Sequence, residues 1–369
     1  GDQLDPDGLA RNLSELHSLR AFGIINFTLD EDGDQHELVV TAPPPPYGRG
    51  SVEIGYSFSD DFDGNTGYTL SARHQLLPIN RRGGEWQNDI QLGTVGLFDS
   101  RLYQPLDPAM KWFIEPSAGF RRELADIWAD GLPVLEYEIE SIEARLAAGR
   151  VLGRWGELRA SAFTADYRAT LRIGPPILPS DNARRGGVRL GFTVDTVDQV
   201  AFATRGTTAA VLYERSIDAL GADTDADLVH ARIEHSFSFR RNTFRPYLEY
   251  GENFDPTLDY INLFKLGGLG RLSGLGDDEL LGEKIALARL LGQRHLTGFK
   301  VAGIDVQVYA GLTLEAGNVY AFDEPITRSS LRTAWGGFVG ARTPLGPLYL
   351  GYGRSGDRDR FYFRIGDRF

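Results

Sequence analysis

The chain has 369 residues, a net charge of −12 and no cysteine. The acidic balance argues against nucleic acid as a partner, and the missing cysteines exclude disulfides and thiolate metal sites. No apolar run approaches the roughly 18–20 residues that a membrane helix needs, so contact with a membrane would have to use strands.

Residues 1–42 differ in pattern from the rest of the chain. Leu9, Leu13 and Leu16 share one face of a predicted helix, because they recur at helical spacing. Two short strands are expected over residues 25–29 and 38–41, joined by an acidic turn with Gly. A helix and a hairpin cannot bury their own apolar faces, so this segment is predicted to complete a larger α+β domain.

Residues 43–46 are four consecutive prolines, which predict a stiff linker without sheet donors. From residue 50 onward the sequence predicts strand after strand, about sixteen in all. A long example runs over residues 304–315, where one face is apolar and the other mostly polar. Turn residues separate the strands at 60–65, 80–84, 174–181, 221–227, 343–347 and 355–359.

Three stretches fit this pattern poorly. Residues 283–290 show no clear alternation, and residues 254–267 could hold one strand or two. A short helical turn is expected near residues 125–129. So many long strands without helices to cover them favour closure into a barrel, with apolar side chains toward lipid and charges in a wet lumen. A soluble β-protein such as a sandwich or propeller is the alternative.

The last strand supports closure. Its apolar face carries Phe361, Phe363, Ile365 and the terminal Phe369, while Tyr362, Arg364 and Arg368 fall on the other face. A strand with one apolar and one charged face that ends on Phe suits the closing strand of a transmembrane β-barrel.

Three C-terminal segments resemble the bacterial surface antigen superfamily, which includes outer-membrane barrel-assembly factors and two-partner secretion transporters. They are FKLGGLGRLSGLGDDELLG (264–282), GLTLEAGNVY (311–320) and GGFVGARTPLGPLYLGYGRSGDRDRFYFRIGDRF (336–369). The resemblance implies an all-β fold: a sixteen-stranded antiparallel transmembrane β-barrel preceded by a partial α+β POTRA (polypeptide-transport-associated) segment. The expected domains are the C-terminal part of a POTRA domain (1–42), the linker (43–49) and the barrel (50–369).

RLSGL and TPLGPLYLGYG are most similar to the patatin-like phospholipase branch, the type V autotransporters of subtype d. That likeness implies an integral protein of the bacterial outer membrane with its POTRA segment in the periplasm. It would anchor, and can translocate, a lipase passenger lying upstream of Gly1. The implied partners are outer-membrane lipid, that passenger, a second copy in a homodimer, and the barrel-assembly machinery, which would read the terminal strand as an insertion signal.

The superfamily carries a Val-Arg-Gly-Phe-like motif in a loop that folds back into the lumen, where its Arg pairs with an acidic residue of the wall. The matching residues here are Leu272, Ser273, Gly274 and Leu275, so serine stands where the family has arginine. The hypothesis is that Arg271 substitutes and pairs with Glu315. The alternative is that the leucines pack while both charges are solvated.

No catalytic site is predicted. The elbow G-x-S-x-G is absent, and residues 353–357 are interpreted as a hairpin turn. The six histidines show no metal-binding spacing, and no cofactor is expected. Besides the anchoring barrel, three functions stay open: an assembly or two-partner secretion transporter acting on separate polypeptides, a passive porin, and a soluble ligand-binding β-protein.

Overall fold

The computed structural model describes residues 26–32, 35–41, 50–129, 131–175, 181–224, 226–255, 260–301, 303–343 and 346–366. The predicted helix at residues 9–16, the proline linker and Phe369 lie outside these ranges. The first described element is an antiparallel hairpin of β1 (Asn26–Asp32) and β2 (Gln35–Thr41), in register from Asn26 opposite Thr41 to Asp32 opposite Gln35. It falls where the sequence predicts two short strands.

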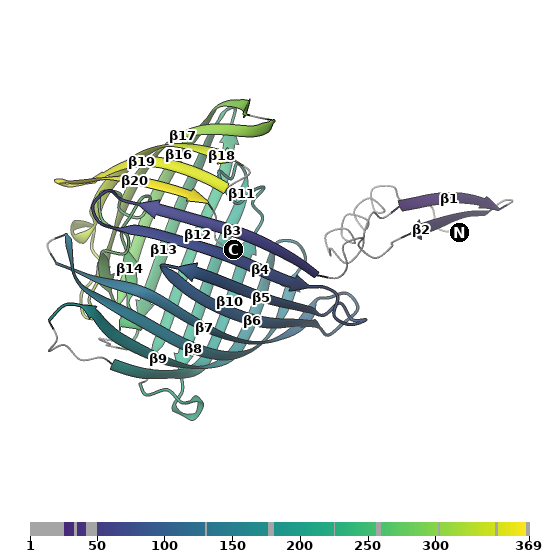
Figure 1. Ribbon diagram of the computed structural model, residues 1–369, viewed down its shortest axis with the longest axis horizontal. Coiled ribbons are helices and arrows are strands. Elements are labelled where there is room, and N and C mark those ends of the chain that lie inside the picture. Colours follow the sequence, from purple (N-terminus) through teal and green to yellow (C-terminus); the bar gives the residue numbers. More distant parts are fainter. Residues whose placement is uncertain are drawn as a thin grey trace.

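Sixteen antiparallel strands form one closed barrel, as predicted (Figure 1). Each strand pairs with its neighbours in the chain, and β20 pairs with β3 to complete the ring. The strands are β3 (Gly50–Asp60), β4 (Thr66–Leu76), β5 (Glu85–Gly93), β6 (Val95–Pro105), β7 (Trp112–Ala129), β8 (Leu132–Leu152), β9 (Gly156–Ile173), β10 (Asp181–Asp195), β11 (Gly206–Ser216), β12 (Asp227–Phe239), β13 (Asn242–Asn253), β16 (Lys284–Val301), β17 (Ile304–Tyr320), β18 (Arg332–Thr343), β19 (Gly346–Ser355) and β20 (Arg358–Gly366).

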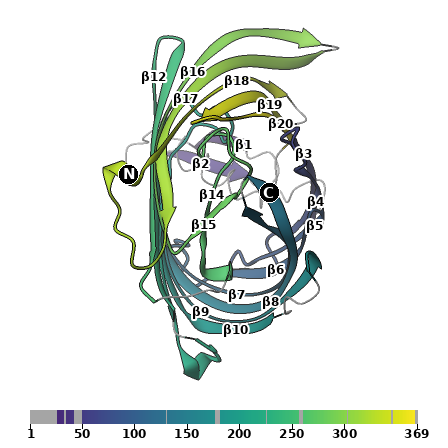
Figure 2. The same ribbon diagram turned by 90° about the vertical axis from the view of Figure 1, so that its left-hand side faces the viewer.

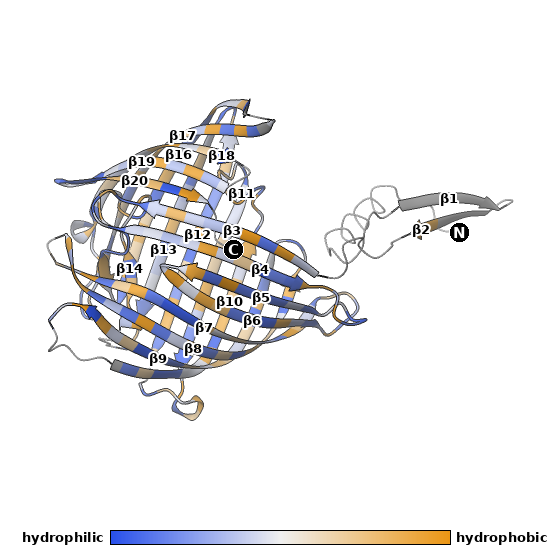
Figure 3. Cartoon of the chain, viewed as in Figure 1, coloured by the Kyte–Doolittle hydropathy of each residue, from blue (hydrophilic) through white to orange (hydrophobic). Residues whose placement is uncertain are grey.

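The barrel is apolar outside and polar inside. In β17, Leu312 and Leu314 are 65% and 64% exposed, whereas Thr313 and Glu315, which alternate with them, are 3% and 4% exposed. Bands of apolar residues alternate with polar ones along the strands in Figure 3. This arrangement is the inverse of a soluble sandwich and typical of a barrel whose outer wall meets lipid. No helix in the described part of the chain is both long and apolar enough to cross a membrane.

Charged side chains line the lumen in pairs. Each of several carboxylates from the inner wall is shared between two guanidinium groups or held closely by one. The pairs are Asp89 with Arg73 and Arg101, Glu214 with Arg185 and Arg189, Glu234 with Arg245 and Arg289, and Glu115 with Arg159.

One expectation about local structure is corrected. Residues 125–129 are no helical turn but the end of β7, where pairing with β8 holds them extended and a register shift follows Ile127. The segment 254–267, for which one strand or two stayed open, holds one strand in its described part. This strand, β14 (Phe264–Leu266), has three residues, lies outside the barrel sheet and follows a 3₁₀ turn, η2 (Tyr260–Asn262).

The seam between β20 and β3 is short in the part of the chain that the structure describes. Among residues up to Gly366, four pairs join these strands, from Phe363 opposite Asp60 to Gly366 opposite Ser57. The next ladder, between β3 and β4, has eleven pairs. Backbone pairing of the described residues is therefore sparse at the point where the two ends of the barrel meet.

Candidate functional site: the lumen loop and the closing strand

The segment between β13 and β16 enters the ring of strands with its described residues 260–283, and we call these residues the lumen loop. Its β14 pairs with β15 (Leu280–Gly282), and Figure 2 shows both labels inside the barrel. Leu266, Leu272 and Leu275 of this loop are fully buried against Ile285 and Leu287 of the inner wall. Apolar packing of this kind fixes the loop in place.

The predicted motif forms a tight turn within this loop. Gly270, Leu272 and Gly274 all have positive φ, at 79°, 69° and 103°. A Cβ at Gly274 would lie 2.6 Å from the backbone nitrogen of Ser355, so the turn approaches β19 too closely for a side chain. The Gly270 N–H donates to Ser273 Oγ at 2.9 Å, which holds the serine inward.

Ser273 contacts the wall carboxylate predicted for this loop. Its backbone N–H donates to one oxygen of Glu315 at 2.6 Å, and its hydroxyl donates to the other at 2.7 Å. The Thr313 hydroxyl also donates to Glu315. All three residues are buried, so this carboxylate is satisfied by neutral donors alone in the described structure.

The predicted pair of Arg271 and Glu315 does not form. Arg271 instead donates two hydrogen bonds to Glu249 of β13, at 2.6 and 3.3 Å, and a third to the Lys265 carbonyl at 3.0 Å. Tyr247 also donates to Glu249, at 2.7 Å. The turn explains the difference, because its positive-φ residues aim positions 271 and 273 at different strands of the wall.

The closing strand holds the lumen loop from the other side. Tyr362 accepts the Gly274 N–H at 2.8 Å and donates to the Leu275 carbonyl at 2.7 Å. Two guanidinium groups on the same face bind loop carboxylates: Arg358 binds Glu279, and Arg364 binds Asp277 at 2.8 and 2.9 Å. The inner face of β20 is thus occupied by loop contacts over most of its length.

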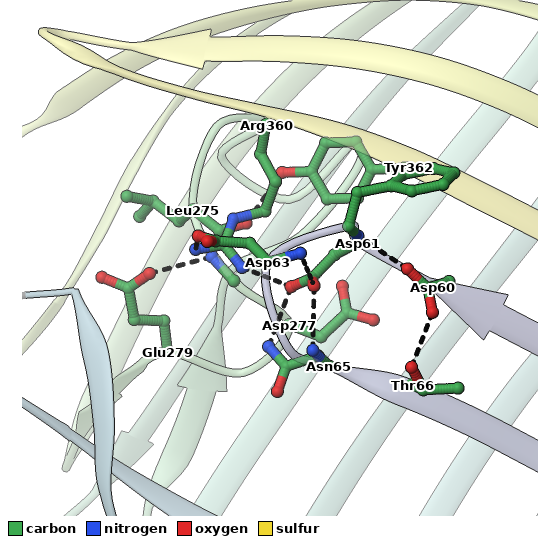
Figure 4. A network of polar contacts seen from close by, with 12 residues as sticks. Asp60, Asp61, Asp63, Asn65, Thr66, Leu275, Asp277, Glu279, Arg360 and Tyr362 are labelled. Atoms are coloured by element: carbon green, nitrogen blue, oxygen red, sulfur yellow. Dashed lines mark hydrogen bonds and ion pairs between the residues drawn. The ribbon is translucent and has the colours of Figure 1, made fainter.

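Arg360, the remaining inward residue of β20, binds the turn between β3 and β4 (Figure 4). It forms ion pairs with Asp61 and, at 2.7 Å, with Asp63. Burial alone would raise the pKa of Asp61, but backbone N–H groups of Asn65 and Asp63 and the guanidinium outweigh it and lower that pKa. This contact bridges the seam where backbone pairing is sparse.

The sequence-predicted residues thus divide into two groups. In the first group, the structure brings together the lumen-loop residues, Glu315 and the closing strand. The contacts differ from those expected, because Glu315 binds Ser273 and Arg271 binds Glu249. Among the terminal residues, Phe361 points outward and Phe363 lies 6.0 Å from the Phe58 ring across the seam, while Ile365 faces Phe58 in register. Sequence reasoning missed Tyr362, Arg360, Glu279 and Asp61. A signal existed, since Arg358, Arg360, Tyr362 and Arg364 alternate with apolar residues.

A second segment enters the barrel at its opposite end. The turn between β10 and β11, residues 196–205, brings Phe202 onto the inner wall, where it is 1% exposed. Its ring stacks on Tyr309 at 4.3 Å and on Tyr349 at 4.9 Å between centroids. The Ala203 carbonyl accepts a bond from Gln293 at 3.1 Å. We call residues 196–205 the lower loop; no pattern in the sequence singles it out.

No group of three or more metal-binding side chains exists among the described residues. The arrangement can act mechanically, because two loops lie in a charged lumen and the lumen loop is bound both to the inner wall and to the closing strand. Charge-assisted hydrogen bonds and buried leucines hold it there together, so its release has to break both.

Comparison with known proteins shows the fold. No protein-family model matches the chain, and no curated protein matches it. Among solved structures, it is similar to BamA from Haemophilus ducreyi lacking POTRA domains 1–3, with a TM-score of 0.72 and 11% identity over 100% of this chain and 80% of that one. It is also similar to CdiB from Escherichia coli, with a TM-score of 0.64 and 14% identity over 100% of this chain and 72% of that one. CdiB from Acinetobacter baumannii gives a TM-score of 0.62 and 14% identity over 99% of this chain and 69% of that one.

Proposed function

We propose that this chain is an outer-membrane barrel of the surface antigen superfamily that carries polypeptide across, or into, the membrane. The observation that carries the proposal is the lumen loop, bound through Ser273 to Glu315 and through Tyr362 to the closing strand. A passive porin needs no such contact between its plug and its seam. The fold that this chain shares with BamA and CdiB supports the same class of function, although one fold can serve several functions.

The finer proposal is an autotransporter barrel that anchors and exports a patatin-like lipase. It rests on the likeness of RLSGL and TPLGPLYLGYG to that branch and on the hairpin β1–β2, which suits the end of a POTRA domain. In this role the barrel is not an enzyme. Its partners are the surrounding lipid, the barrel-assembly machinery, the passenger and a second copy of the chain.

The second candidate is a transporter that acts on separate polypeptides. The resemblance to a superfamily that includes two-partner secretion transporters favours it, and the chain shares its fold with CdiB. The two candidates share the barrel and differ in what is attached to it, so the residues of the barrel alone do not separate them.

The sequence encoded upstream of Gly1 separates them first. A G-x-S-x-G elbow with a distant Asp-Gly supports the lipase fusion, whereas tandem POTRA repeats contradict it. Export is then tested by antibody labelling of the passenger on intact cells that express the full-length protein. Cysteines at Ser273 and Glu315, bridged by a reducible crosslinker, should block surface exposure until a reductant is added.

A matched control places the cysteines at Lys300 and Asp305, which face each other at the far end of the β16–β17 hairpin. Crosslinking there leaves the lumen loop free and should leave export unchanged. Equal export from both crosslinked proteins would contradict a role for loop release.

A further inference from the structure

An apolar groove of about 690 Å³ runs across the outer wall over β13 and β16 to β20. One in-register row of residues produces it. Two glycines in this row each lie between two large residues. In order, the row consists of Phe244, Gly292, Leu312, Gly337, Tyr352 and Phe361. Each glycine leaves a gap between two large neighbours, so the wall is hollowed instead of smooth.

The walls of the groove are apolar and exposed. Leu312, Val339, Leu350 and Phe361 all rank among the exposed large hydrophobic residues of the chain. Trp335 adds an aromatic wall, with its ring 5.8 Å from that of Tyr352. A hollow with this lining suits a flexible hydrocarbon chain, which gains contact with the strand floor that a smooth wall would not give.

One end of the groove is cationic. Arg294 is the only charged residue among the described residues that line it. It faces Asn242 in register, and both residues line the groove. No ion pair of Arg294 with another described residue is present. An exposed guanidinium on a lipid-facing wall is costly unless an anion meets it.

We propose that the groove binds one anionic phospholipid, with an acyl chain over Gly292 and Gly337 and the phosphate at Arg294. Charge complementarity selects the headgroup, and the glycine gaps hold the chain. The inference rests on the proposed membrane location of the barrel. It adds to it a specific lipid at one place on the wall, beyond the general lipid shell that any such barrel has.

Native mass spectrometry of the detergent-purified protein tests this with dioleoyl phosphatidylglycerol and dioleoyl phosphatidylcholine, which share their chains. We expect one phosphatidylglycerol to be retained per barrel and phosphatidylcholine to be lost. The variant Arg294→Gln should weaken binding about fivefold, given the contribution of one arginine near an anionic headgroup. The control Arg82→Gln removes the same charge from an exposed turn and should bind like the parent protein.

The chain site is tested separately. Gly292→Leu with Gly337→Leu should weaken phosphatidylglycerol binding several-fold, because the new side chains fill the groove. A Cβ at Gly292 meets nothing closer than 3.7 Å, and a Cβ at Gly337 would lie 3.2 Å from the flexible end of Leu312. Ala144→Leu on the exposed face of β8 is the control. Equal retention of both lipids, unchanged binding in Arg294→Gln and in the double glycine variant, displacement by free glycerol phosphate, or a second protein copy on this wall would each overturn the proposal. A protein without a heat-modifiable band on unheated gels would instead contradict the barrel itself.

Discussion

At the scale of single residues, the buried contact of Ser273 with Glu315 replaces the arginine pair that the sequence suggested. The resemblance identified the loop and the wall acid, because both lie in segments whose letters match the family. It did not identify the partner, since the direction of each side chain depends on the positive φ of Leu272 and on the two glycines beside it. Backbone conformations with positive φ do not produce a periodic pattern of residue types, so a sequence pattern does not predict them.

A double-mutant cycle measures this contact. We expect Ser273→Ala and Glu315→Gln to be coupled by about 1 kcal/mol or more in the free energy of unfolding, because the hydroxyl donates to a buried charge. Urea midpoints of the refolded barrel give the values. The control cycle pairs Arg271→Ala with Glu315→Gln and should show coupling under about 0.5 kcal/mol. A stronger coupling of Arg271 with Glu315 than of Ser273 with Glu315 would instead support the predicted arginine pair.

Asp61 gives a prediction for pH dependence. Because its pKa in the folded protein is lowered from the ordinary 3.8, the stability it provides is present above that pH and is lost as pH falls through the folded pKa. Asp61→Asn should therefore be less stable than the parent at pH about 7 and equal to it at strongly acidic pH. Melting of the heat-modifiable band at several pH values checks this. A constant difference down to the lowest pH would contradict the assignment.

At the scale of elements, β16 shows why the sequence of one strand lacks the alternation of apolar and polar residues. The sequence of residues 283–290 does not alternate because Ile285 and Leu287 face the lumen and are nevertheless apolar. Leucines of the lumen loop cover them. Alternation of apolar and polar residues predicts a strand well where one face is in contact with water, as in β17. It fails where a segment distant in the sequence covers the inner face and excludes water from it.

The lower loop makes an element-scale prediction. Phe202→Ala removes a ring that is stacked on two tyrosines, so the loop should leave the lumen and the conductance of the barrel in planar bilayers should rise. Stability should fall by about 3–5 kcal/mol if the site does not collapse. Val200→Ala in the same loop is the control, since Val200 is 87% exposed. Equal conductance of the two variants would show that this loop does not close the lumen.

At the scale of the whole molecule, the number of strands and their antiparallel order follow from the sequence, because most strands carry their own alternation and are separated by turn residues. Closure of the last strand on the first is implied by the resemblance to sixteen-stranded barrels. The inner arrangement of the two loops does not follow, since it depends on contacts between residues far apart in the chain. The result is a cylinder whose exterior is apolar, whose lumen is ionic, and whose seam is bridged from within by Arg360.

The most direct test of this account uses the absence of native cysteine. Single cysteines at Leu312, Thr313 and Leu314 are labelled with a fluorophore, and the barrels are placed in bilayers with brominated acyl chains. Because side chains alternate between lipid and lumen along β17, strong quenching is expected at positions 312 and 314 and weak quenching at 313. Equal quenching at all three positions, or quenching greatest at 313, would contradict a closed barrel with its apolar face toward lipid.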